Sequence, residues 1–311
     1  MKVLVTGAAG FVGSYITERL INENYDVNIL DHRIFNKNLN DEVISKTNYF
    51  EGDIRDEDLV SEASSGCDII FHFAALVGVD AYSKSKALTM EVEGDGLKNV
   101  CKYALNNNCK KIIYPSSSAV YGRQIKTSAL NESDLCAPIS NYAIAKRYNE
   151  IYLESLYAEQ EIQSVCLRIF NVYGPRQDDR LVIPRFIEKA FSNEIIEIYG
   201  DGKQTRDFVY IDDVVTAAVF SAEKVNGHEV VNVSTGIEYS ISDLTKSIQK
   251  NTGSNTNVIY KEIPKKRNNF EVDACTGNSS KLQELTGYKP NTSLDEGIRK
   301  TCEFIKQDLL K

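Results

Sequence analysis

The sequence predicts an α/β protein, with a doubly wound parallel sheet followed by a smaller, mixed α/β domain. Two observations support this fold class. Short apolar runs alternate with helical patterns through the first half of the 311 residues, and no repeat, low-complexity tract or flexible linker divides the chain. Strand–helix alternation is typical of a parallel sheet covered by helices on both faces. Ligands of such sheets bind at the carboxyl ends of the strands.

The individual elements follow from the spacing of apolar residues. Strands are expected at 2–6, 26–30, 68–73, 112–116 and 164–169, which are β-branched or aromatic runs between polar residues. Helices are expected at 11–22, 88–107 and 142–161. After residue 171 the elements become shorter and prolines are scattered. We therefore expect one domain over 1–170 and a second over 171–311, with the segment of roughly 206–236 as a candidate to return to the first.

Composition restricts the classes of partner and location. The net charge of −8, without a lysine or arginine block, argues against a nucleic-acid surface. The apolar start is interpreted as a buried strand rather than a signal peptide, and no run approaches the ~20 apolar residues of a membrane span. Seven scattered cysteines without a CxxC pair, and only three histidines, indicate a cytoplasmic protein with reduced thiols and no metal site.

Three glycines between the first strand and the first helix indicate a dinucleotide site. Gly7, Gly10 and Gly13 have the spacing GxxGxxG. Glycines at such a turn let backbone N–H groups approach a pyrophosphate at the helix N-terminus. Asp31 ends the second strand, where an acid accepts hydrogen bonds from the adenosine ribose and repels a 2′-phosphate. NAD is therefore favoured over NADP, although Arg33 supports the alternative.

Two further segments suit the same cofactor. Asp53 has two interpretations, which the sequence leaves open: it accepts a hydrogen bond from the adenine amino group, or it caps a helical segment at 57–63. The strand end His72-Phe-Ala-Ala75 carries small residues that permit close passage of the cofactor.

Tyr142 and Lys146 form a candidate catalytic pair. Positions i and i+4 share one helix face, roughly 5–6 Å apart at their β-carbons. At ~5 Å and an effective dielectric of ~20, the ammonium is worth about 3 kcal/mol to a phenolate. The spacing predicts that Lys146 lowers the pKa of Tyr142 from about 10 toward neutral pH, where the phenol can act as a base. Alone, such a pair is common on solvated helices.

Seven segments in order make the chain resemble the extended short-chain dehydrogenase/reductases, specifically the NAD-dependent nucleotide-sugar epimerase/dehydratase family. They are GAAGFVG (7–13), HFAA (72–75), SSSAVYG (116–122), YAIAK (142–146), LRIFNVYGPRQ (167–177), YGDGKQTRDFVYIDDV (199–214) and NVSTG (232–236). The resemblance covers the chain almost end to end. It implies a Rossmann-type domain for NAD, a C-terminal domain for a nucleoside-diphosphate sugar, and a homodimer formed through the two long helices.

The resemblance also implies roles for single residues. Tyr142 is the base, Lys146 lowers its pKa and holds the nicotinamide ribose, and Ser117 positions the 4-OH of the sugar. The alternative for Ser117 is a strand-end serine that bonds its own backbone. The residues expected at the cofactor are Gly7, Gly10, Phe11, Val12, Gly13, Asp31, Asp53, Ile54, Phe73, Ala74, Ala75, Tyr142, Lys146 and Phe170.

Two residues match positions that the family uses for the sugar diphosphate, Asn171 and Arg206. Arg206 has an alternative as a surface ion pair with Asp207 or Asp212. Arg267 resembles a second diphosphate arginine, but its local sequence, RNNFE, is one residue longer than the usual pattern.

Two more residues are expected near the sugar. Tyr199 stands where an aromatic or apolar residue flanks the base. Cys275 falls where some hexose 4-epimerases have a bulky tyrosine, so it predicts room for an N-acetyl or other large substituent. A core cysteine is the alternative.

The residues after Ser117 decide among the reactions of the family. Dehydratases carry Asp-Glu there, decarboxylases a Glu at the second position, and 3,5-epimerases a Cys, whereas this chain has Ser118 and Ala119. The resemblance therefore implies a 4-epimerase of a UDP-hexose (UDP-glucose/galactose, UDP-GlcNAc/GalNAc or UDP-glucuronate). The alternatives are a 4-keto-sugar reductase, another nucleotide-sugar dehydratase or decarboxylase and, remotely, a non-catalytic dinucleotide sensor. Glu93 stands where the family usually has Asn, and the sequence offers no account of its effect.

Overall fold

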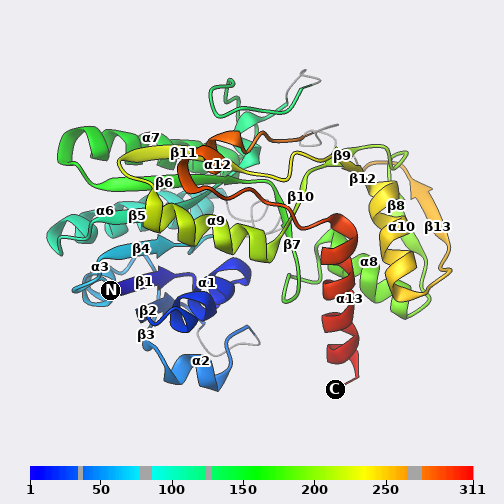
Figure 1. Cartoon of the computed structure of the whole chain (residues 1–311), viewed down its shortest axis with the longest axis horizontal. Coiled ribbons are helices and arrows are strands. Elements are labelled where there is room, and N and C mark those ends of the chain that lie inside the picture. The colour runs from blue at the N-terminus through cyan, green and yellow to red at the C-terminus, as the bar shows by residue number, and fades with distance from the viewer. Residues whose placement is uncertain (34–37, 77–85, 124–127, 265–274, 311) are drawn as a thin grey trace.

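A computed structural model describes residues 1–33, 38–76, 86–123, 128–264 and 275–310. Its centre is a seven-stranded parallel sheet (Figure 1). The strands are β1 (Lys2–Thr6), β2 (Asp26–Asp31), β3 (Asn48–Glu51), β4 (Ile69–His72), β5 (Lys111–Ser117), β6 (Gln163–Ile169) and β11 (His228–Val233). Their order is β11-β6-β5-β4-β1-β2-β3, all parallel. The predicted doubly wound parallel sheet is thus confirmed.

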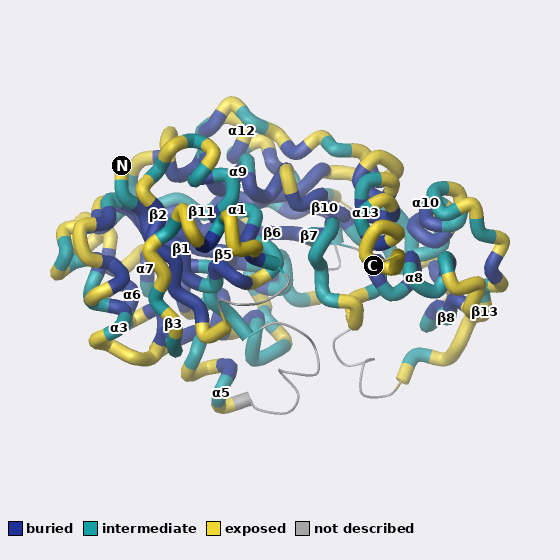
Figure 2. Tube along the Cα trace, turned by 90° about the horizontal axis from the view of Figure 1, so that it is seen from below, coloured by how far each residue is buried: buried dark blue, intermediate teal, exposed yellow. Residues whose placement is uncertain are grey.

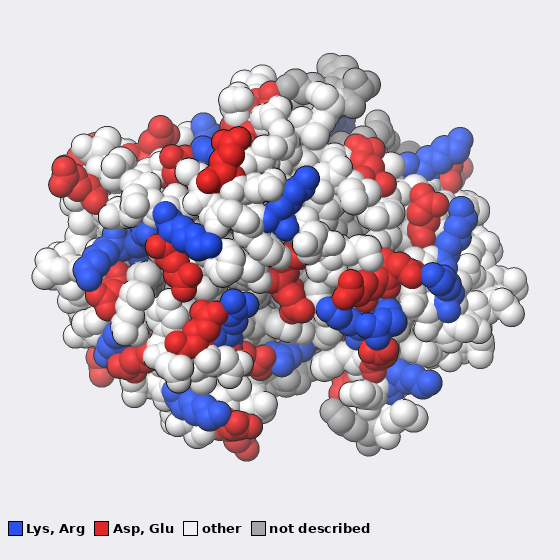
Figure 3. Space-filling model, in the orientation of Figure 1, with Lys and Arg blue, Asp and Glu red and all other residues white. Residues whose placement is uncertain are grey.

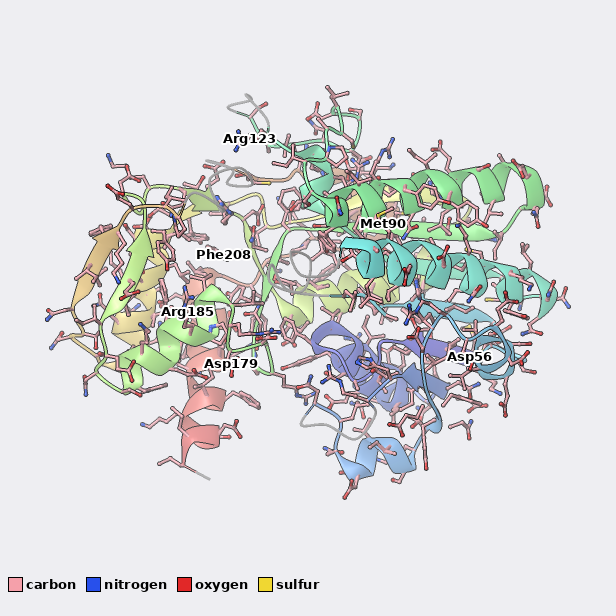
Figure 4. All side chains as sticks on the ribbon, turned by 180° about the vertical axis from the view of Figure 1, so that it is seen from behind. Asp56, Met90, Arg123, Asp179, Arg185 and Phe208 are labelled. Atoms are coloured by element: carbon pink, nitrogen blue, oxygen red, sulfur yellow. The ribbon has the colours of Figure 1, made fainter. Side chains whose placement is uncertain are left out.

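Helices cover both faces of the sheet. Helices α1 (Phe11–Asn22) and α9 (Ile211–Lys224) lie on one face, and α3 (Glu57–Ala63), α6 (Gly96–Asn106) and α7 (Asn141–Gln160) on the other. Figure 1 shows the first pair in front of the sheet, and Figure 4, from behind, shows α6 and α7 in front. Alternate residues of β1 serve the two faces: Val3 and Val5 belong to one apolar core and Leu4 to the other.

The predicted helix at 88–107 contains a π-turn. Its parts are α5 (Lys86–Met90), the π-helical η1 (Glu91–Asp95) and α6. A π-turn inside a helix is rare and frequently marks a functional site. The other long helix, α7, begins after Ser140, whose side chain accepts a hydrogen bond from the Ala143 N–H.

Two strands of the sheet were not predicted. Strand β3, NYFE, is only four residues long and mostly exposed, so it lacks a run of alternating buried residues. Strand β11 comes from the second half of the chain and pairs with β6, with Val233 opposite Ile169. The neighbouring α9 packs on the face that carries α1.

The remaining elements form a second lobe, at the right of Figure 1. Three short strand pairs belong to the second half of the chain: β7 (Asn171–Tyr173) with β10 (Phe208–Tyr210), β8 (Ile196–Tyr199) with β13 (Val258–Lys261), and β9 (Thr205–Arg206) with β12 (Tyr239–Ser240). The helices of the lobe are α8 (Val182–Phe191), α10 (Ile241–Thr252) and α13 (Leu294–Leu309). Figure 2 shows their buried sides turned toward one another. Three short elements pack on the first lobe instead: α2 (Asp41–Ser45), η2 (Ser118–Tyr121) and α12 (Ser280–Thr286).

The strand order reverses between β1 and β4, and sheets of this kind bind ligands at the carboxyl ends of the strands beside such a reversal. The glycine turn follows β1, Asp31 ends β2, the segment 73–75 follows β4, and Ser117 ends β5. The predicted site residues of the first lobe therefore meet at one edge of the sheet.

On the face drawn in Figure 3, lysine and arginine side chains are interspersed with aspartate and glutamate. In the described ranges, no helix combines the length and the apolar character needed to cross a bilayer.

Candidate active site

The glycine turn packs so closely that side chains are excluded at two positions. Gly7 has a φ of +69°, and a β-carbon there would lie 2.5 Å from the backbone of Phe73 and Ala74. A β-carbon on Gly13 would lie 2.1 Å from the carbonyl oxygen of Gly7. Gly10 precedes α1 and provides no capping side chain. The first N–H groups of a helix have no intrahelical partner, so this turn directs uncapped donors toward the carboxyl edge of the sheet.

Asp31 connects the end of β2 to the glycine turn. Its Oδ2 accepts a hydrogen bond from the Ala9 N–H at 3.0 Å, and its Oδ1 accepts one from the Arg33 N–H at 3.1 Å. The His32 ring lies 3.1 Å from the same Oδ1. The carboxylate is therefore fixed beside the turn. Its contact with an adenosine ribose stays a prediction.

The helix-cap interpretation of Asp53 is wrong. Asp56, labelled in Figure 4, caps α3, and its side chain accepts a hydrogen bond from the Leu59 N–H at 3.1 Å. Asp53 instead binds the Arg55 guanidinium, with 3.0 Å from Nε to Oδ1 and 2.6 Å from Nη2 to Oδ2. Ile54 is buried against Gly96 of α6. The contact of Asp53 with adenine stays a prediction.

The end of β4 is fixed by Thr6. The Thr6 hydroxyl lies 2.8 Å from His72 Nδ1 and accepts a hydrogen bond from the Ala74 N–H at 3.2 Å. Phe73, Ala74 and Ala75 are half-buried. The backbone of this segment lies directly against the glycine turn. Small side chains at 74 and 75 leave space beside the turn for a cofactor.

Ser117 and Tyr142 are in direct contact. The Ser117 hydroxyl hydrogen-bonds the Tyr142 phenol, and it also accepts a hydrogen bond from the Ala119 N–H at 3.2 Å. The local backbone bond that the alternative interpretation of Ser117 expects is therefore present, and its contact with a sugar 4-OH stays a prediction. The two groups come from the end of β5 and the first turn of α7.

Lys146 is engaged in a buried ion pair that the sequence did not predict. Its Nζ lies 2.9 Å from Glu93 Oε2, and the two side chains are 2% and 0% exposed. The same Nζ lies 4.7 Å from the ring centre of Tyr114 and 5.6 Å from that of Tyr142. The Tyr114 hydroxyl donates to Glu93 at 3.2 Å. The Asn149 amide donates to the Tyr114 hydroxyl at 2.8 Å and to the Glu93 carbonyl at 2.9 Å.

The predicted lowering of the Tyr142 pKa by Lys146 stays a prediction, and other groups around the phenol act in the opposite direction. Burial raises the pKa of Tyr142 well above its ordinary value, and the Glu93 carboxylate raises it further, against the opposing hydrogen bond from Ser117. The ammonium of Lys146, which the spacing places beside Tyr142, is paired here with the Glu93 carboxylate.

The second lobe brings Cys275 and Arg206 to the end of β5. The Cys275 thiol hydrogen-bonds the Ser118 side chain. The positive charge of Arg206 is near enough to act on the thiol by lowering its pKa. The backbone bond from the Asp207 N–H to the Cys275 carbonyl, at 3.1 Å, fixes this approach. The Asp207 carboxylate accepts hydrogen bonds from the backbone N–H groups of 235, 236 and 277. Burial raises the pKa of the Cys275 thiol to about 11.

Two other predicted substrate residues, Asn171 and Tyr199, lie on strands of the second lobe. Asn171 is exposed at the start of β7, directly after the buried Phe170. Tyr199 ends β8 and is half-buried, and its carbonyl accepts a hydrogen bond from Gln204. Arg267 lies outside the described residues. Whether these residues bind substrate stays a prediction.

Sequence reasoning missed the polar cluster around Lys146, which we define as Glu93, Tyr114, Asn149 and His72. The His72 ring stacks on Tyr114 at 6.1 Å between ring centres. Glu93 departs from the family pattern. The sequence could not predict its ion pair with Lys146, because the two residues stand on different helices. Asn149, at i+3 from Lys146, has a spacing that could have indicated a shared face.

Comparison with known proteins gives the family. The model of the NAD-dependent epimerase/dehydratase family matches residues 3–234. The chain belongs to the NAD-dependent epimerase/dehydratase family. It is 32% identical to a UDP-N-acetyl-alpha-D-glucosaminuronate decarboxylase of Bacillus cytotoxicus, with 98% of each chain covered. It is 33% identical to a putative UDP-glucose 4-epimerase of Methanocaldococcus jannaschii, over 98% of this chain and 99% of that one. A crystal structure of UDP-glucose 4-epimerase with UDP-glucose from Thermotoga maritima superposes with a TM-score of 0.93 at 32% identity, covering 99% of this chain and all of that one.

The cofactor of this epimerase/dehydratase family member is NAD, which solved relatives contain. The residues of this chain fit it. Gly7 and Gly13 have no space for a β-carbon, Gly10 leaves the first N–H groups of α1 uncapped, and Asp31 is fixed at the end of β2. These residues would hold the dinucleotide, with Tyr142 and Lys146 at its reactive end.

Proposed function

We propose that the protein is a nucleotide-sugar 4-epimerase acting on a UDP-hexose. NAD, when bound, supplies the acceptor and then the donor of one hydride. Tyr142 removes the proton from the sugar 4-OH while carbon 4 loses its hydride, which leaves a 4-keto sugar. Tyr142 returns the proton after the hydride has come back to the opposite face of carbon 4. The cofactor is unchanged after the full cycle.

The side chains of this chain divide the work around the 4-OH. Ser117, which hydrogen-bonds Tyr142, orients the hydroxyl oxygen toward the base. Lys146, on the next turn of α7, holds the nicotinamide ribose. The proton therefore moves between the sugar and Tyr142 alone, within a short hydrogen-bonded pair.

One observation carries the choice of 4-epimerisation: the two residues after Ser117 are Ser118 and Ala119, without a carboxylate. Loss of water or of carbon dioxide requires a further acid or base near carbons 5 and 6. The thiol of Cys275 reaches Ser118, but burial raises its pKa to about 11, so it is protonated at neutral pH. The simplest reaction of the 4-keto sugar, return of the hydride, is the one that these residues support.

Products resolved by NMR test the proposal. The protein is incubated separately with UDP-glucose, UDP-GlcNAc and UDP-glucuronate, without added cofactor. We expect a 4-epimer of at least one substrate and no net change in NADH absorbance. Loss of water from a substrate would contradict the proposal in favour of a dehydratase. In a separate incubation with NADH, reduction of a 4-keto sugar would contradict it in favour of a reductase.

A second candidate is decarboxylation of a UDP-glucuronate derivative. It is favoured by the similarity to the decarboxylase of Bacillus cytotoxicus, which spans nearly the whole chain. The residue after Ser118 opposes it, since Ala119 cannot act as an acid. Carbon dioxide released from UDP-glucuronate in the same assay would establish this candidate and exclude the first.

We propose that the substrate lies between the end of β5 and the second lobe. Arg206 and Asn171 would bind the diphosphate, with Arg267 as a second arginine, and Tyr199 would flank the base. Cys275 is a small side chain in direct contact with Ser118. It leaves room for a large substituent such as an N-acetyl group.

We further propose a homodimer through α7. Ile144, Tyr148 and Ile151 recur at i, i+4 and i+7 and are 44%, 40% and 50% exposed. Met90 of α5, labelled beside α7 in Figure 4, extends this apolar stripe. A second copy of the same face would cover it, as expected for a two-fold interface.

The proposed location is the cytoplasm, which agrees with seven free cysteines.

A further inference from the structure

Glu93 lies at the centre of the polar cluster, directly behind the candidate base. Its carboxylate is fully buried, 2.9 Å from Lys146 Nζ and 3.2 Å from the Tyr114 hydroxyl. The π-turn of η1 places it there, and the Asn149 amide fixes the turn by bonding the Glu93 carbonyl. A buried carboxylate is costly unless it is paired, so Glu93 and Lys146 hold each other in this position.

The titratable groups packed around the Glu93–Lys146 pair are neutral, which leaves this pair as the charges beside Tyr142. Tyr114 comes from β5, and its pKa is raised well above the ordinary value by burial and by Glu93, so it stays neutral. His72 comes from β4, and burial together with Lys146 lowers its pKa to about 3, so it is neutral as well. Cys166 of β6 faces Tyr114 and is a neutral thiol, because burial raises its pKa.

Three atoms of the cluster lack a partner among the described residues. They are Glu93 Oε1, Asn149 Oδ1 and His72 Nε2, all buried. Buried polar atoms without a partner are rare and call for an explanation beyond packing. A purely structural ion pair would be expected to satisfy both carboxylate oxygens.

We propose that Glu93 is a positioning residue of the active site, whose carboxylate offsets the ammonium charge of Lys146 beside Tyr142. The inference deepens the proposed function, because it rests on Tyr142 being the base. The lysine then holds its place without stabilising the phenolate, and Tyr142 stays protonated to higher pH than the Tyr-xxx-Lys spacing alone predicts. The reaction should accordingly accelerate toward alkaline pH.

Direct titration of Tyr142 tests this without turnover. Full-length protein with saturating NAD is labelled with tyrosine carrying ¹³C at the ζ carbon, and the Tyr142 resonance is assigned by its loss in Tyr142→Phe. In the wild type we expect the Tyr142 midpoint to lie above the neutral pH that the Tyr-xxx-Lys spacing alone predicts. In Glu93→Gln the midpoint should fall by at least one pH unit, a tenfold change in acidity. An unchanged or higher midpoint would overturn the proposal.

Matched variants separate charge from packing. Glu93→Asp keeps the carboxylate and should titrate like the wild type. Glu150→Gln breaks another buried ion pair of α7, with Arg168, and should not move Tyr142. A fall of equal size in Glu150→Gln would mean that loosened packing, not the Glu93 charge, is responsible, and the proposal would fail.

A double variant provides a second measurement if Glu93→Gln alone does not fold. Glu93→Gln combined with Lys146→Met removes both charges, and offsetting charges predict a midpoint close to the wild type. Lys146→Met alone should raise it, and a double variant that titrates like Lys146→Met would refute the offset. If no UDP-sugar is epimerised but the midpoints move as stated, the proposed function fails and the role of Glu93 stands.

Discussion

Tyr142 lies between two groups that act on its acidity in opposite directions. The Ser117 hydroxyl lowers its pKa by a hydrogen bond, while burial and the Glu93 carboxylate raise it. Spacing alone could predict Tyr142 and Lys146, because i and i+4 on a helix must share a face. It could not predict Glu93, which reaches Lys146 from another helix, 53 positions earlier in the sequence, through a π-turn.

Replacement of the Tyr142 hydroxyl tests the assigned base. Tyr142→Phe removes the group that accepts the proton but keeps the ring, so we expect kcat to fall by about 10² to 10⁴. The variant should still bind NAD, and the shift in melting temperature on adding NAD measures this binding. Activity within tenfold of the wild type would mean that another group takes the proton.

Other single residues of the site were predictable because local geometry restricts them. The glycine spacing indicated the turn, and Gly7 and Gly13 have no room for a side chain. The sequence leaves two roles open for Asp53, a contact with adenine and a helix cap. The structure excludes the cap, because Asp56, three residues later, already provides it. Sequence gives the type of a turn more readily than the residue that caps the next helix.

At the scale of elements, α7 serves two opposite surfaces. Lys146, Asn149 and Glu150 point inward and are buried, whereas Ile144 and Ile151 are exposed. The inner face holds both buried ion pairs of the site region, with Glu93 and with Arg168 of β6. The helix was predicted from its length and pattern. Its polar inner face was not, because buried charges are stable only with partners that the fold supplies.

The Glu150–Arg168 pair predicts how stability depends on pH. Burial alone would raise the pKa of Glu150, but its hydrogen bonds and ion pair with Arg168 outweigh burial and lower it. A lowered pKa means that the pair stabilises the fold above the unfolded glutamate pKa of about 4.3 and loses this contribution as pH falls through the folded value.

Glu150→Gln removes that contribution. We expect a loss of about 3 to 5 kcal/mol in the free energy of unfolding at pH 7, because Arg168 stays buried without its partner. Urea denaturation at pH 7 and at about pH 4 measures it. The difference between variant and wild type should shrink at the lower pH. A constant difference would show that lost packing, rather than the ionised carboxylate, is responsible.

At the scale of the whole molecule, the chain crosses between its two lobes more than once. After the first elements of the second lobe, α9 and β11 pack with the first-lobe sheet, and β11 completes it beside β6. The parallel sheet followed from the alternation of elements in the first half. The seventh strand could not be assigned in the same way, since His228–Val233 is a short run whose partner lies about 60 residues away and is found only through tertiary pairing.

The exposed apolar stripe on α7, formed by Ile144, Tyr148 and Ile151, is the proposed interface with a second copy of the whole molecule. Ile151 is 50% exposed in the middle of the stripe, and a lysine there would bury a charge in the proposed interface. We expect wild-type protein to elute at twice the 34.9 kDa of one chain, and Ile151→Lys at the monomer mass, in light scattering after size exclusion. Leu309→Lys is the matched control, since Leu309 is 57% exposed on α13, away from the stripe, and should remain dimeric. If Ile151→Lys is a dimer as well, the two copies associate through another surface.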